Sequence, residues 1–68
     1  MQIRLKPETE TKITLGANGI IQSDSQLELR FNQSEDGKLI IPAYTIVNLS
    51  PNADVYVTSL DYTIVKVF

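Results

Sequence analysis

Apolar and polar residues alternate along several short stretches of this chain. In the clearest stretch, Gln26–Asn32, every second residue is apolar: Leu27, Leu29, Phe31. Successive side chains of a β-strand point to opposite faces, so a period of two predicts a strand with one buried face. Ser25 and Glu28 would also suit the capping box of a helix, but the unbroken alternation favours the strand. We therefore expect the three apolar residues in a core.

Two shorter alternating stretches come earlier, Gln2–Lys6 and Lys12–Leu15. Pro7 ends the first of them or confines it to a sheet edge, because proline donates no backbone hydrogen bond. Asn18-Gly19 follows the second and precedes Ile20-Ile21. This dipeptide is typical of a two-residue hairpin turn in which both residues take positive φ. The pattern predicts a hairpin there.

The second half of the chain, Lys38 to Phe68, is dominated by β-branched and aromatic residues, which favour strands. Asp36-Gly37 predicts a turn that would pair Gln26–Gln33 with Lys38–Ile41. Pro42 cannot donate to a strand ladder, so it predicts a kink, a bulge or the passage to another sheet.

Three further strands are expected after this proline: Tyr44–Leu49, Asp54–Ser59 and Asp61–Phe68. Ser50–Ala53 joins the first two, and Pro51 at its second position suits a type I turn. Leu60-Asp61 is either a tight turn or a bulge within one long strand. The whole pattern predicts a single all-β domain over residues 1–68. We expect a small antiparallel β-sandwich or barrel of about seven short, hairpin-connected strands.

The last strands are apolar on both faces, unlike a sheet with one solvated face. In Asp61–Phe68, compact Val65 and Val67 share one face and suit the core, which leaves the aromatic face for a partner. A chain of 68 residues can cover one face of its sheet with its own second layer but hardly both. Aromatic residues are enriched at the cores of protein interfaces. The predicted interface residues are Tyr44, Ile46, Tyr62, Ile64 and Phe68.

Composition narrows the classes of function. Six basic residues stand against eight acidic ones, for a net charge of −2, and they are scattered, which argues against a nucleic-acid surface. Cysteine and histidine are absent, which removes disulfides and thiolate metal sites. No apolar run approaches the roughly 20 residues of a membrane helix. The N-terminus does not resemble a signal peptide, so we expect cytoplasmic synthesis.

Candidate chemistry is sparse. Asp54 and Asp61 could form an acid–base pair, and Asn52 with Asp54, or Glu35-Asp36, could offer oxygen ligands to Ca²⁺. Neither set has the spacing of a known calcium loop. Three tyrosines could stack nucleic-acid bases, but only Lys66 lies near them in sequence: Tyr44, Tyr56, Tyr62. We expect no catalytic residue, no cofactor and no metal.

These patterns predict a non-enzymatic structural module that associates with protein through an apolar sheet face. We expect a homo-oligomer, with a trimer favoured over a dimer, or a larger protein lattice, and neither nucleic acid nor membrane as partner. By analogy of class, the best match is a small accessory protein of a phage particle, incorporated into the virion as a capsid cement, decoration or tail component. The alternatives are a small inhibitor of another protein and a non-catalytic nucleic-acid-binding barrel.

Overall fold

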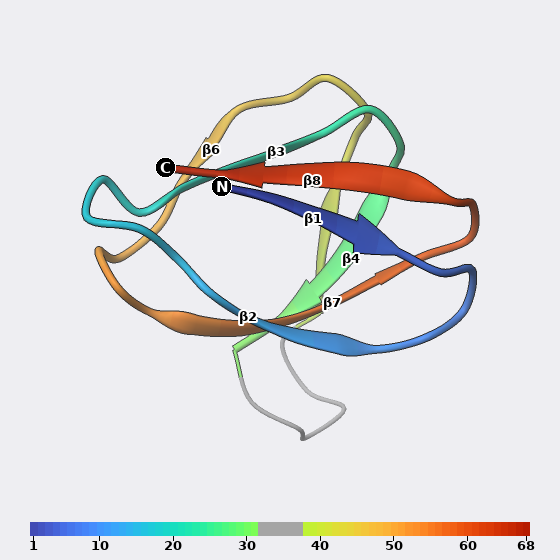
Figure 1. The fold of residues 1–68 in the computed structure, drawn as a ribbon, viewed down its shortest axis with the longest axis horizontal. Helices are drawn as coiled ribbons and strands as arrows, with labels where there is room; N and C mark the ends of the chain where they lie inside the picture. The colour runs from blue at the N-terminus through green and yellow to red at the C-terminus, as the bar shows by residue number, and fades with distance from the viewer. Residues whose placement is uncertain (32–37) are drawn as a thin grey trace.

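Short β-strands make up the regular structure of the computed structural model, which describes residues 1–31 and 38–68 (Figure 1). The described residues contain no helix. The eight strands are β1 (Gln2–Leu5), β2 (Thr11–Thr14), β3 (Ile20–Ser23), β4 (Leu27–Arg30), β5 (Leu39–Ile41), β6 (Val47–Asn48), β7 (Asp54–Ser59) and β8 (Thr63–Val67). The predicted all-β class is confirmed, with one strand more than expected.

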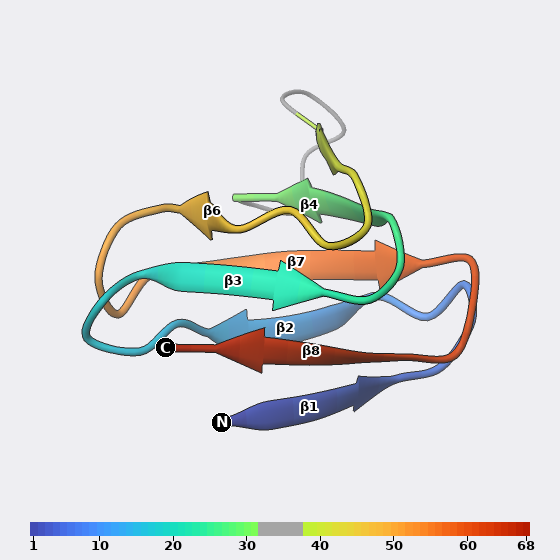
Figure 2. The same cartoon turned by 90° about the horizontal axis from the view of Figure 1, so that it is seen from above.

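The strands form two antiparallel four-stranded sheets, in the orders β1-β8-β3-β6 and β2-β7-β4-β5. The two layers lie one above the other in Figure 1, and Figure 2 looks down on the sheet β1-β8-β3-β6 with the other sheet behind it. The pairs β1–β8, β2–β7, β3–β6 and β4–β5 are nested, as if one long hairpin had been wrapped over itself. Pairs β3–β8 and β4–β7 then complete the two sheets. This is the strand order of an eight-stranded jelly roll, so the expected β-sandwich is confirmed.

Nearly every connection carries the chain from one sheet to the other. Only β4 and β5 are consecutive strands that pair with each other, as the sequence predicted; their turn at Asp36-Gly37 lies outside the described residues. The hairpin expected at Asn18-Gly19 is wrong, because β2 and β3 belong to different sheets. A strand with one apolar face can cover the core from either sheet. Its alternation therefore does not show which strand it pairs with. Leu60-Asp61 likewise joins strands of opposite sheets, so it is not a bulge within one strand.

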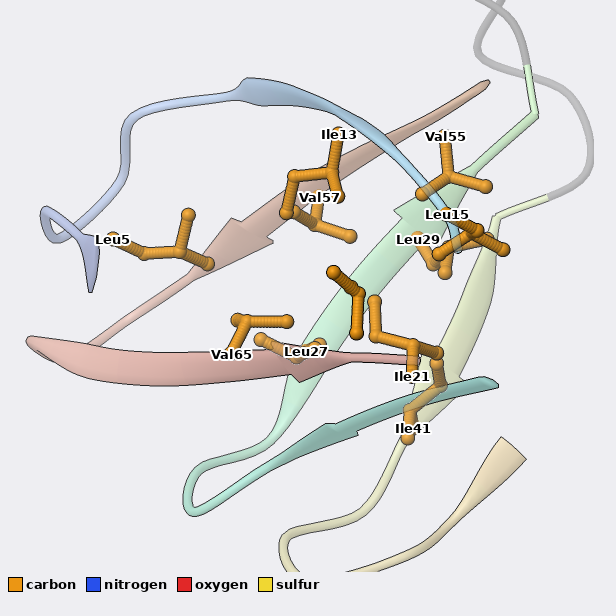
Figure 3. Close-up of a cluster of buried hydrophobic side chains, with 11 residues drawn as sticks. Leu5, Ile13, Leu15, Ile21, Leu27, Leu29, Ile41, Val55, Val57 and Val65 are labelled. Atoms are coloured by element: carbon orange, nitrogen blue, oxygen red, sulfur yellow. The ribbon is translucent and has the colours of Figure 1, made fainter. Parts of the chain in front are cut away.

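The core lies between the two sheets and draws on both (Figure 3). Its buried apolar residues are Leu5, Ile13, Leu15, Ile21, Leu27, Leu29, Ile41, Val55, Val57, Val65 and Val67. The predicted inward positions of Leu27 and Leu29, and of the two valines of β8, are confirmed. Phe31 is an error of the prediction, because β4 ends at Arg30 and the phenyl group, beyond the last paired residue, is 53% exposed.

Two turns differ in type from those the sequence predicted. Gly19 has φ of 63° as expected, but Asn18 is not among the residues with positive φ, and the Gly19 N–H donates to Gly16 O at 3.1 Å. In the turn Ser50–Ala53, the Ala53 N–H donates to Ser50 O at 3.2 Å. Its third residue, Asn52, has φ of 58°, which is the mark of type II rather than type I.

The expected strand Tyr44–Leu49 is reduced to the two residues of β6. Tyr44 lies in a turn instead, with φ of 63°, and the Thr45 N–H donates to Pro42 O at 3.3 Å. The Tyr44 N–H donates to Ser23 O at 2.8 Å, which ties this turn to the end of β3. The turn carries the chain from β5 to β6 in the other sheet. Of the three alternatives predicted at Pro42, the passage to another sheet is therefore confirmed.

Candidate interaction surfaces

The outer face of the sheet β2-β7-β4-β5 is mainly polar. Lys12 Nζ lies 3.7 Å from Asp54 Oδ2, and Thr14 Oγ1 donates to Asp54 Oδ1 at 2.6 Å. Arg30 of β4 forms an ion pair with Glu10, the residue before β2. The side chains of Lys12 and Asp54 are more than half exposed, so their pair contributes about 0–1 kcal/mol. This face is therefore suited to water, except at Ile40, which lies outward on β5 opposite Glu28.

The outer face of the other sheet mixes cationic and apolar side chains. Arg4 of β1 lies opposite Ile64 of β8, and Lys66 lies between Gln2 and Gln22. A shallow hollow of about 270 Å³ is lined there by Arg4, Leu5, Tyr62, Thr63 and Ile64. Only one of these lining side chains is charged, so the hollow offers a ligand little polar recognition.

Apart from Phe31 at the end of β4, the exposed large apolar side chains gather at three places on the described surface. Leu60 and Tyr62 occupy the β7–β8 connection, and Met1 and Phe68 lie at the opposite end of β8. The third group follows the side of the sandwich where β5 and β6 are the sheet edges; its members are Leu39, Ile40, Tyr44 and Ile46. We call this group the β5–β6 side. These side chains lie outside the buried core, so they are the candidates for contact with a partner.

The five predicted interface residues do not form one surface. Ile64 lies on the outward side of β8, Tyr62 precedes the strand and Phe68 follows it, and Lys66 stands between Ile64 and Phe68. Ile64 is half-buried, whereas Tyr62 is 79% exposed. Tyr44 and Ile46 belong instead to the β5–β6 side, because the expected strand became a turn. Their role in an interface stays a prediction.

Two exposed residues of the β5–β6 side were not among the predicted interface residues. Leu39 and Ile40 lie in a short apolar run that resembles a buried strand. Their exposure follows from the position of β5 at the edge of its sheet. Strand order is a property of the whole fold, so no local signal in the run could have revealed it. Leu60 was missed for a simpler reason, since it was read only as part of a connection.

Among the other candidates, the acid–base pair is not assembled. Asp54 begins β7 and Asp61 follows its end, so a six-residue strand of roughly 20 Å separates the two carboxylates. Tyr56 lies in the opposite sheet from the β8 end next to Tyr62, so these two tyrosines share no stacking platform. Glu35-Asp36 lies outside the described residues. Residues 1–31 and 38–68 contain no group of three or more His, Cys, Asp or Glu placed to hold a metal ion.

Neither a membrane-spanning helix nor a similar protein identifies the function. Within the described ranges, no helix is long and apolar enough to cross a membrane. Jelly rolls occur among viral capsid, lectin and cupin domains, and such a fold carries many unrelated functions. No family model, no curated protein and no solved structure matches the chain.

Proposed function

We propose that this protein is a non-enzymatic structural module that works by association of its own copies. The observation that carries the proposal is large apolar side chains exposed outside a completed core. Eleven core residues are at most 2% exposed, so the two sheets already cover each other. The apolar side chains of Tyr44, Ile46 and Tyr62 nevertheless lie in water. Larger apolar patches on soluble proteins commonly mark protein–protein contacts.

The setting that fits such a module best is a virion, where it would serve as an accessory protein of a phage particle. Jelly rolls are a common architecture of viral capsid domains, and that analogy of fold supports the proposal. The chain is small and free of cysteine, so association with neighbouring copies or a protein lattice supplies stability that a short chain otherwise lacks. Its jelly roll is compatible with either role, in a closed oligomer or in a larger lattice.

The experiment is sedimentation equilibrium combined with thermal melting over a wide range of protein concentration. We expect a mass above the 7.6 kDa monomer and a melting midpoint that rises with concentration, because association stabilises only the folded chain. A protein that stays monomeric at high concentration, with a constant midpoint, would contradict self-association.

Substitutions of exposed side chains locate the contact. Tyr44→Ser, Tyr62→Ser and Phe68→Ser each remove an exposed aromatic group and should leave the monomer folded. Deletion of Phe68 is a poor test, since its N–H donates to Ile20 O at 3.0 Å and its carbonyl accepts from the Ile20 N–H at 3.3 Å. Variants that lower the mass but not the melting midpoint of the dilute protein identify the contact.

A further inference from the structure

Each sheet has two edge strands, and only one of the four is apolar on both sides. β1 exposes Arg4 and is followed by Pro7, and β2 carries the ion-paired Lys12. β6 is only two residues long. Charges, prolines and shortness are the usual protections of a sheet edge against pairing with another chain. β5 is also short, but its three residues include no charge and no proline, and it exposes Leu39 at its inner face and Ile40, 48% exposed, at its outer face.

We propose that two copies of this chain pair antiparallel through β5, so that the sheet β2-β7-β4-β5 continues into its counterpart. This inference rests on the proposed function and names the partner and the contact. An edge strand presents backbone N–H and C=O groups that only another extended chain can satisfy in sequence. Lys38 and Pro42 flank β5 and limit the ladder to its three residues. A two-fold pairing uses the β5 edge of both copies, so the contact closes on two copies.

The residues of β5 are complementary to themselves. With a two-fold axis at Ile40, the outward side chain of Ile40 lies opposite Ile40 of the second copy. On the inner face Leu39 lies opposite Ile41 of the second copy. Every cross-strand pair is then apolar on both faces, and such pairs stabilise antiparallel ladders by about 0.2–1 kcal/mol each. A two-fold contact uses the same patch on both copies, as most soluble dimers do.

Charges across the junction are also complementary. Lys38 of each copy lies opposite Pro42 of the other, so the two lysines stay on opposite ends of the contact. Each lysine shares the outer face with Glu28 of the other copy, on the strand next to β5. Within the described residues Glu28 forms no ion pair of its own. The pairing therefore adds a cation of one copy to the outer face that carries Glu28 of the other, two strands away, and it keeps the two lysines apart.

Cysteine crosslinking tests the register directly, because the natural chain contains no cysteine. In Ile40→Cys, the two introduced thiols would lie directly opposite each other, with Cα atoms about 4.5–5.5 Å apart. That separation suits a disulfide. We expect nearly complete dimer formation under mild oxidation at micromolar protein. Leu60→Cys is the matched control. Leu60 is more exposed, at 72%, but it follows β7, two strands from β5, so the two copies of Leu60 would lie far apart across the junction and this variant should remain largely monomeric.

A second variant, Ile40→Lys, places two lysines opposite each other and should weaken self-association about tenfold or more. Its dilute melting midpoint should stay near that of the natural chain, since Ile40 contributes little to the core. A natural chain that is oligomeric while Ile40→Cys crosslinks no faster than Leu60→Cys would overturn the β5 contact and leave the proposed function standing. A natural chain that is monomeric at every concentration would overturn both.

Discussion

Two buried hydroxyl groups join the ends of β3 and β8. Ser23 Oγ lies 3.1 Å from Thr63 Oγ1, and Ser23 Oγ also accepts the Ser25 N–H at 3.1 Å. Both side chains are buried, and among the described residues no buried side-chain polar atom is left without a partner. Ser23 Oγ therefore takes part in two hydrogen bonds and Thr63 Oγ1 in one, so removing the two hydroxyls should have different costs.

Ser23→Ala removes the shared group and leaves both the Thr63 hydroxyl and the Ser25 N–H without this partner. A buried polar group without a partner costs about 1–3 kcal/mol, and Ser25 is partly accessible to water, so we expect a loss of about 2–3 kcal/mol. Thr63→Val keeps the shape of the side chain and breaks only one bond, because Ser23 still accepts from Ser25. Its expected cost is about 1 kcal/mol.

The decisive measurement is Thr63→Val in the background of Ser23→Ala. The Thr63 hydroxyl has already lost its partner there, so replacing it with a methyl group should be neutral or stabilising. Urea unfolding of the four proteins, with matching slopes, gives the free energies of a double-mutant cycle. If Thr63→Val costs the same in both backgrounds, the two hydroxyls do not interact and the reasoning fails. The natural chain must first be shown to unfold in two states at the concentration used.

Further substitutions test the core, a turn and a surface ion pair. Leu29→Ala should cost about 2–5 kcal/mol because its side chain is fully buried, whereas Glu28→Ala on the outer face should be nearly silent by thermal melting. Gly19→Val should destabilise by roughly 1–3 kcal/mol, because φ is 63° and a Cβ would lie 2.5 Å from Leu49 O; an unchanged midpoint would contradict this turn geometry. Lys12→Ala should lower the free energy of unfolding by less than about 1 kcal/mol, because its pair with Asp54 is exposed to water; a larger loss, measured by urea unfolding, would contradict this reading of the pair.

Local pattern was enough to predict the class of fold and most of the core. The alternation around Leu27 and Leu29 placed them correctly, and compact valines in β8 do face inward. These predictions succeed because a side chain's direction within a strand follows from its position alone. The same rule placed Phe31 wrongly, since alternation does not say where pairing stops.

The pairing of strands that are distant in the sequence could not be predicted from local pattern. Asn18-Gly19 gives the correct local signal for a reversal of the chain, and Gly19 does have positive φ. The strands on either side nevertheless pair with β7 and β8, which lie far away in the sequence. For the same reason the predicted interface residues were grouped on one face, although Tyr44 lies in a turn next to β3.

The nested pairing of strands has a consequence for how the chain folds. The innermost pair, β4–β5, is also the most local, and the outermost pair joins Ile3 to Val65. Closing a long loop costs chain entropy, and that cost falls once inner pairs have drawn the flanking segments together. We therefore expect assembly to proceed from β4–β5 outward, with slow folding for so small a domain. Measured folding and unfolding rates test this order. Substitutions at Leu27 should slow folding, whereas substitutions at Ile3 should mainly accelerate unfolding. On this route the two terminal strands dock last, so the chain must be complete through β8 before its outer pair can close.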